Sequence, residues 1–133
     1  MLTNVASKSE IKSELEKYQF HAEIHLSENP EEVVLWAQEA LVYLGRTAKL
    51  IADAQYHKDR KMRSELTDQI KTITAFAPST ANKFVDSLME EENYLLKWAE
   101  RQNAAFARQI DFARTIISKA KEELKYTHTT TNG

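Results

Sequence analysis

The sequence contains no cysteine, only two glycines and only two prolines in 133 residues. Without cysteine, disulfide bonds, thiolate zinc sites and cysteine nucleophiles are excluded. The scarcity of Gly and Pro, beside abundant Ala, Leu, Glu and Lys, predicts an all-α protein. No apolar run approaches the roughly 20 residues that span a bilayer, and the N-terminus lacks the apolar segment of a signal peptide. These absences predict a cytoplasmic location.

The sequence also lacks an excess of either charge, with a formal net charge of −2. Residues 30–76 carry seven Lys or Arg against seven Asp or Glu, and residues 79–133 carry eight against eight. No domain-scale basic field therefore exists to capture nucleic acid. The one local basic cluster consists of Lys58, Arg60, Lys61 and Arg63. This cluster leaves a nucleic-acid-associated accessory role as a minor alternative.

One apolar stripe runs from Val33 to Ala77 without a slip in phase. At about 100° per residue, its members share one helical face. They are Ala37, Leu41, Leu44, Ala48, Ile51, Gln55, Met62, Leu66, Ile70, Ile73 and Ala77. Asn29 and Pro30 suit the N-cap and first position of a helix, and Pro78 ends it. The pattern predicts one continuous helix over residues 30–76, including its polar stretch at 55–61.

A second long helix is predicted over residues 80–126. The turn at Pro78–Ser79 is so short that the two long helices become antiparallel neighbours, with Leu44 beside Ala113. A capping box of Ser7 and Glu10 opens a shorter helix over about 8–25. The sequence therefore predicts one helical domain over residues 1–126, a long antiparallel hairpin with a short N-terminal helix. Residues 127–133 are predicted to form a disordered polar tail.

A second stripe on the first long helix consists of Trp36, Tyr43 and Leu50, about 120° from the first. A hairpin of roughly 70 Å with one short additional helix leaves much apolar surface exposed, which is typical of an interface. We expect a homo-oligomer in which two hairpins complete a helical bundle through this stripe. The alternative is a monomer whose N-terminal helix lies over Trp36 and Tyr43.

Polar residues interrupt the stripes. Gln55, Gln102 and Gln109 occupy positions that the periodicity reserves for Leu or Ile. The expected register places Gln55 opposite Gln102 or Arg101, and Gln109 opposite Ala48. A buried amide without partners costs roughly 1–3 kcal/mol, so such residues often fix register or oligomeric state. The other interpretation is a polar gap beside small residues that receives a ligand or a partner side chain.

Cations flank this predicted gap. Four on the second long helix share an edge opposite its apolar face, as in a solvated surface or a site for an anionic partner: Lys97, Arg101, Arg108 and Lys119. The candidate ligand- or partner-binding residues are therefore Arg46, Gln55, Arg101, Gln102, Arg108 and Gln109.

Two pairs at i, i+4 spacing could carry chemistry. His21 and His25 offer two ligands of a helical metal site, but no third ligand completes it, so no metal or other cofactor is predicted. Asp53 and His57 are expected to form an exposed polar pair. No nucleophile–base arrangement and no Gly-rich phosphate loop occur in the sequence. We therefore predict that the protein is not an enzyme.

Three segments carry a resemblance to a known group: ALVYLGRTAKLIADAQYH at 40–57, ENYLLKWAERQN at 92–103 and IDFARTIIS at 110–118. They resemble small all-helical accessory proteins of tailed phages and prophages of Bacteroides-type bacteria. The resemblance implies a phage-encoded protein in the host cytoplasm, which binds or inhibits a host factor such as a defence component. It assigns no functional residue.

The sequence thus predicts a non-enzymatic, oligomeric helical binding protein. The first alternative is a sponge for an anionic nucleotide bound at a helix interface. Binding to nucleic acid is the second alternative.

Overall fold

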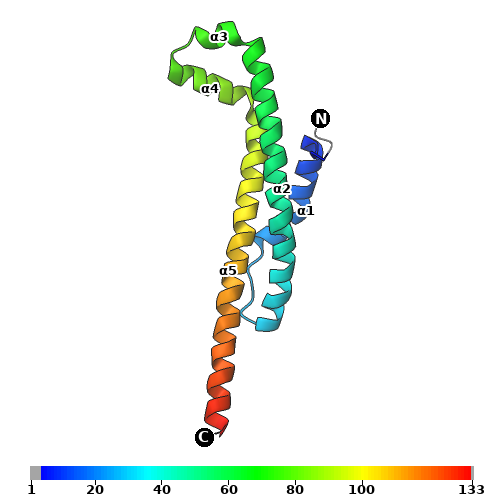
Figure 1. The fold of residues 1–133 in the computed structure, drawn as a ribbon, viewed down its shortest axis with the longest axis vertical. Helices are drawn as coiled ribbons and strands as arrows, with labels where there is room; N and C mark the ends of the chain where they lie inside the picture. The colour runs from blue at the N-terminus through cyan, green and yellow to red at the C-terminus, as the bar shows by residue number, and fades with distance from the viewer. Residues whose placement is uncertain (1–3, 133) are drawn as a thin grey trace.

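The computed structural model describes residues 4–132, with side chains described as far as Tyr126. Over this range the chain forms α1 (Lys8–Glu23), α2 (Pro30–Asp68), α3 (Ile70–Thr74), α4 (Pro78–Leu88) and α5 (Glu90–Asn132). The prediction of an all-α fold is confirmed. Helices α2 and α5 lie side by side and run in opposite directions, and α1 packs along part of their length (Figure 1).

The first helix begins at the predicted capping box. The Ser7 side chain accepts a hydrogen bond from the backbone N–H of Glu10, and the Glu10 carboxylate accepts one from the N–H of Ser7. The helix ends at Glu23 because Ile24 is extended, with φ −70° and ψ 136°. Its buried face consists of Ile11, Leu15, Tyr18 and His21.

The second helix begins at the predicted cap, where Asn29 Oδ1 accepts a hydrogen bond of 3.0 Å from the N–H of Glu31. It continues through the polar stretch at 55–61, as predicted, and ends at Asp68. Gln69 then leaves the helical region, with φ −113° and ψ 17°. The predicted helix over 30–76 is therefore interrupted eight residues before its expected end.

Helices α3 and α4 fold aside at one end of the hairpin (Figure 1). The rings of Phe76 and Phe84 pack with centroids 5.5 Å apart, so bending lets these two apolar side chains cover each other. Met89, which separates α4 from α5, is non-helical and fully buried. The predicted helix over 80–126 thus begins two residues earlier and is divided at Met89. Helix α5 continues to Asn132, into the predicted tail, while Gly133 lies outside the described residues.

This bent end changes the register of the hairpin. Asn103 Nδ2 donates 2.9 Å hydrogen bonds to Leu44 O and Thr47 Oγ1, so Leu44 lies beside Asn103 and the predicted pairing with Ala113 is wrong. Ala113 packs with Val33 instead. The reason is that α3 and α4 form the return path to one side, so α5 begins beside the interior of α2. Lys61 and Glu90 accordingly line one surface hollow.

The buried face of α2 is rotated from the predicted one. Ala40, Thr47 and Ala54 are buried, whereas Leu41 is 55% exposed. Ala48 and Gln55 are also exposed, and Gln55 Nε2 donates a 2.8 Å hydrogen bond to Asp59. The physical cause is that α1 and α5 pack on different sides of α2, and together they bury the sector between them.

The stripe of Trp36, Tyr43 and Leu50 is covered by α1. The Tyr18 and Tyr43 rings stack with centroids 4.5 Å apart, and His21 lies 4.5 Å from Trp36. Leu50 is fully buried within the chain. The prediction that this stripe forms the oligomer interface is therefore wrong. Its side chains contact α1 of the same chain, which agrees with the alternative that the N-terminal helix lies over Trp36 and Tyr43. Self-association remains a prediction that requires another surface.

Polar contacts fasten the segment just before α1 to α2. Asp53, which is 4% exposed, accepts a 3.1 Å hydrogen bond from the N–H of Ala6. The His57 ring donates from Nε2 to Ala6 O at 2.6 Å. The expected exposed pair of Asp53 and His57 is therefore a clamp on the segment before α1.

An ion pair also links α1 to α5. Lys8 Nζ lies 2.7 Å from Glu92 Oε2. Burial alone would raise the pKa of Glu92, but hydrogen bonds from Lys8 and the backbone, with the Lys8 charge, hold it below its usual range. The carboxylate form of Glu92 is therefore stabilised at the α1–α5 contact.

His21 is the most enclosed titratable group of α1. It is 6% exposed and contacts the rings of Trp36, Tyr43 and Phe106, with Nδ1 3.3 Å from Glu39. Its Nε2 has no hydrogen-bond partner among the described residues. Burial lowers the pKa of His21 below 6.5, against the Glu39 carboxylate, which raises it. The imidazole is therefore neutral in the folded protein at neutral pH.

We expect the folded protein to lose stability below pH 6.5 partly because of His21. Because the pKa of His21 is lower in the folded protein, the unfolded chain binds the proton at a higher pH than the folded protein does. The stability that neutral His21 contributes is therefore complete above its unfolded pKa, and it is lost as pH falls from the unfolded pKa through the folded pKa. His21→Phe keeps the ring contacts and should reduce the fall in Tm between about pH 7 and 5. Calorimetry beside the exposed control His25→Phe tests this. Equal pH slopes in all three proteins would contradict it.

Candidate binding groove

Two surface hollows follow the seam between α1 and α5, and both are lined by Ala22 and Ala105. We call them together the α1–α5 groove. The larger hollow has a volume of about 590 Å³ and the smaller about 340 Å³. The larger is lined by Gln19, Ala22, Tyr94, Lys97, Trp98, Arg101, Gln102 and Ala105. The smaller is lined by Ala22, Ile24, His25, Leu26, Ala105, Arg108, Gln109 and Phe112.

The groove is long because one helix supplies an entire wall. From Tyr94 to Phe112, α5 rises by about 27 Å at 1.5 Å per residue. Ala22 and Ala105 lie where the two hollows meet, and their small side chains leave space between α1 and α5. Beyond Glu23 the chain leaves the helix, so the side of the smaller hollow opposite α5 is formed mainly by the connection to α2, at Ile24, His25 and Leu26.

Two buried glutamines of α5 hold α1 in position. Gln102, which is 2% exposed, donates from Nε2 to Leu15 O at 2.8 Å and to Gln19 Oε1 at 3.1 Å. Gln109, which is 8% exposed, donates to His21 O at 2.7 Å. Both glutamines therefore contact α1, and the predicted contacts with Gln55 and Ala48 across the hairpin are wrong.

The same two side chains leave acceptors without partners. Gln102 Oε1 and Gln109 Oε1 are buried and accept no hydrogen bond from any described residue. An unsatisfied buried carbonyl is unfavourable by about 1–3 kcal/mol. Both residues line the groove. At its base, their Nε2 groups donate hydrogen bonds, whereas their Oε1 atoms accept none from the described residues.

Aromatic rings form one end of the groove. The rings of Tyr94 and Trp98 are 5.7 Å apart and inclined by 52°. Trp98 Nε1 donates a 2.7 Å hydrogen bond to Gln19 Oε1, which fixes the indole against α1. Tyr94 is 60% exposed, so an aromatic face is available to a ligand.

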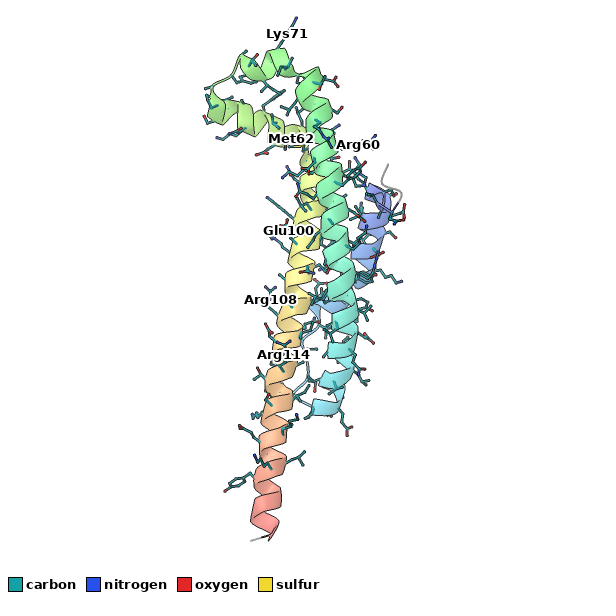
Figure 2. All side chains as sticks on the ribbon, in the orientation of Figure 1. Arg60, Met62, Lys71, Glu100, Arg108 and Arg114 are labelled. Atoms are coloured by element: carbon teal, nitrogen blue, oxygen red, sulfur yellow. The ribbon has the colours of Figure 1, made fainter. Side chains whose placement is uncertain are left out.

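Cations border the groove along its length. Lys97 and Arg101 line the larger hollow, and Arg108 lines the smaller. Arg108 projects from the side of α5 away from α2 (Figure 2). None of the described residues that line either hollow is Asp or Glu. The groove therefore has the electrostatic character of a site for an anionic ligand.

The structure brings together four of the six predicted site residues: Arg101, Gln102, Arg108 and Gln109. Arg46 lies elsewhere, at the α1–α2 contact, where its guanidinium donates to both oxygens of Glu14 at 3.2 and 2.7 Å. Gln55 is likewise absent from the groove and lies exposed on α2.

Sequence reasoning missed the aromatic residues of the groove. Tyr94 and Trp98 are spaced i, i+4, with Lys97 and Arg101 on neighbouring positions, a pattern that places two rings and two cations on adjoining faces of a helix. The contributions of Gln19 and Ala22 could not be identified in this way, because they depend on how α1 docks.

No other chemistry is apparent in the described part of the chain. His21 is buried while His25 is exposed, so this pair does not converge. Residues 4–126 contain no group of three or more His, Asp or Glu side chains that could hold a metal ion. Among the described helices, none is both long and apolar enough to cross a membrane.

The chain matches no protein-family model, no curated protein and no solved structure.

We expect Gln19→Ala to loosen Trp98 and α1 together. The substitution removes the acceptor for Trp98 Nε1 and for Gln102 Nε2, so stability should fall by about 1 kcal/mol or more. In a Trp36→Phe background, Trp98 emission should move to longer wavelength as the indole becomes more hydrated. The exposed neighbour substitution Glu16→Ala is the control and should leave emission unchanged. An unchanged spectrum in Gln19→Ala would refute this account of the groove wall.

Proposed function

We propose that the chain is a non-enzymatic binding protein whose α1–α5 groove receives an acidic, partly apolar segment of a partner protein. The observation that carries this proposal is the lining of the groove, in which cations and aromatic rings occur together without an acidic side chain among the described lining residues. Arginine binds carboxylates through paired hydrogen bonds, and aromatic side chains contribute large apolar contact areas.

The dimensions favour a helical segment. About 27 Å of α5 borders the groove, which equals five turns of a partner helix. Lys97, Arg101 and Arg108 are spaced by four and seven residues, so carboxylates on one face of a helix lying in the groove can approach all three. An amphipathic helix in a groove is a common mode of peptide recognition.

An anionic nucleotide is the second candidate ligand. It is favoured by the Tyr94–Trp98 ring pair beside Lys97 and Arg101 in the larger hollow. The volume of about 590 Å³ lies within the range of small-molecule sites. In this alternative, a base stacks on an aromatic ring and phosphate oxygens accept hydrogen bonds from the two cations.

The other predicted roles have less support. The basic cluster at 58–63 lies on α2 outside the groove, where Lys61 pairs with Glu65 and Arg60 donates to the Tyr56 hydroxyl. Nucleic-acid binding is therefore the weakest of the alternatives. The resemblance to phage accessory proteins favours a host protein as the source of the acidic segment, and this remains part of the proposal.

A direct binding experiment separates the two ligands. The probe is a synthetic amphipathic helix of about 18 residues, with leucines on one side and glutamates at the spacing of the three cations. Trp98 emission in Trp36→Phe protein reports binding. We expect saturable binding of this peptide and weaker binding of a version with lysine in place of glutamate.

Substitutions then locate the site. The double variant Arg101→Ser/Arg108→Ser should weaken peptide binding by about 10-fold or more, because two charge-assisted contacts are lost. Arg114→Ser, an exposed arginine of the same helix outside the groove, is the matched control. Binding of ATP in place of the peptide would favour the nucleotide. Binding of neither probe, or equal binding of both peptides, would contradict the proposal.

A further inference from the structure

Six residues of α2 form a stripe in which every side-chain position is exposed. It consists of Val34, Gln38, Leu41, Gly45, Ala48 and Ala52, and we call it the α2 seam. Its spacings alternate between four and three residues, which is the pattern of positions that face a second helix in a coiled coil. At 100° per residue the seam lies opposite Trp36, Tyr43 and Leu50, the side that α1 covers.

Large apolar side chains gather at one end of this face. Val34 and Leu41 are 39% and 55% exposed, and Leu35 and Val42 beside them are 65% and 63% exposed. Four large apolar residues thus lie exposed within about two turns of one helix. Contiguous apolar surface of this kind is typical of an interface.

Gly45 adds an independent observation. Glycine in the middle of a helix lowers helix stability relative to alanine, so it requires a reason. A Cβ built at Gly45 would meet no heavy atom within 4 Å among the described residues, apart from its own helical backbone and chain neighbours. Packing within the chain therefore does not require this glycine, whereas close approach of a second helix would.

We propose that two copies of the chain form a two-fold symmetric dimer in which their α2 helices pack antiparallel along the α2 seam. In one antiparallel register, Leu41 of each copy faces Gly45 of the other. The same register places Val34 opposite Ala52 and Gln38 opposite Ala48. Each large side chain then faces a small one, as dense packing requires. A parallel pair would instead oppose Leu41 to Leu41 and leave a gap at Gly45.

The charges of α2 identify the occupant as a second copy. The first turn of the helix is acidic, with Glu31 and Glu32, and both are exposed. Its later part carries the basic cluster at 58–63 defined above. The antiparallel register that matches Leu41 to Gly45 also places Glu31 opposite Gln55, about one helical turn from the start of that basic cluster. Size and charge are therefore complementary in the same arrangement, twice per dimer, as a two-fold interface requires.

This inference is independent of the groove, because the α2 seam shares no residue with the lining of the groove. The first test is sedimentation equilibrium of the full chain. We expect a dimer for the parent and at least about 100-fold weaker association for Leu41→Glu, since each interface would bury two unpaired carboxylates. Phe20→Glu, which replaces a 76% exposed residue of α1, is the control and should remain dimeric.

Circular dichroism must show unchanged helix content in each variant, and Gly45→Leu provides a second way to block the seam. A monomeric parent at about 100 µM, or dimers that persist in both Leu41→Glu and Gly45→Leu, would overturn the proposal, because a specific dimer saturates well below that concentration.

Cross-linking tests the register directly, because the chain contains no cysteine. Leu41→Cys protein and Gly45→Cys protein, distinguished by size tags, are mixed and oxidised mildly. The antiparallel register brings these unlike positions within disulfide range, which requires Cα atoms closer than about 7 Å. We expect the mixed disulfide to exceed either like pair several-fold. Predominance of like pairs would indicate a parallel dimer and overturn the proposed register.

Discussion

The hydrogen bonds from Gln102 and Gln109 to the backbone of α1 determine which surfaces this molecule exposes. A helix of 16 residues is marginal in isolation, so α1 depends on its docking. Once docked, it covers the stripe of Trp36, Tyr43 and Leu50, which would otherwise be the obvious apolar interface. It also forms the second wall of the groove. The opposite side of α2 remains uncovered. The position of this one short helix therefore determines both where the groove forms and which side of α2 is left exposed for the proposed self-association.

The features predicted from sequence are those with local causes. The capping box of Ser7 and the Asn29–Pro30 start each depend on residues within a few positions of one another, and the structure contains both. The helix breaks at Gln69 and Met89 carry no Gly or Pro signal, because burial of Met89 and contact between Phe76 and Phe84 favour them. The register error follows from these breaks, since residues 69–89 form a bent return path and not a straight hairpin end.

The candidate site was predictable in part for a related reason. Gln102 and Gln109 stood out because they occupy positions expected for Leu, and Arg101 and Arg108 adjoin them on the same helix. Their actual partners, Leu15 O and His21 O, lie more than 80 residues away in sequence and could not be inferred from periodicity. Each amide donates a hydrogen bond to α1 but leaves its own carbonyl oxygen buried without a partner among the described residues. Docking of α1 therefore includes an unfavourable free-energy contribution from two unsatisfied buried acceptors. Such local departures from an optimal core are common at functional sites.

The groove and the α2 seam share no residues, so occupation of one does not block the other. A two-fold dimer through the seam would carry two grooves, related by the symmetry axis and each bordered by the cations Lys97, Arg101 and Arg108. A partner with two acidic segments could then bind both, and the second contact would form at a high effective concentration. Bivalent attachment of this kind raises apparent affinity by about 10²–10⁴ without any new contact, provided that the linker spans the two sites. Modest affinity at a single open groove is therefore compatible with tight capture by the dimer.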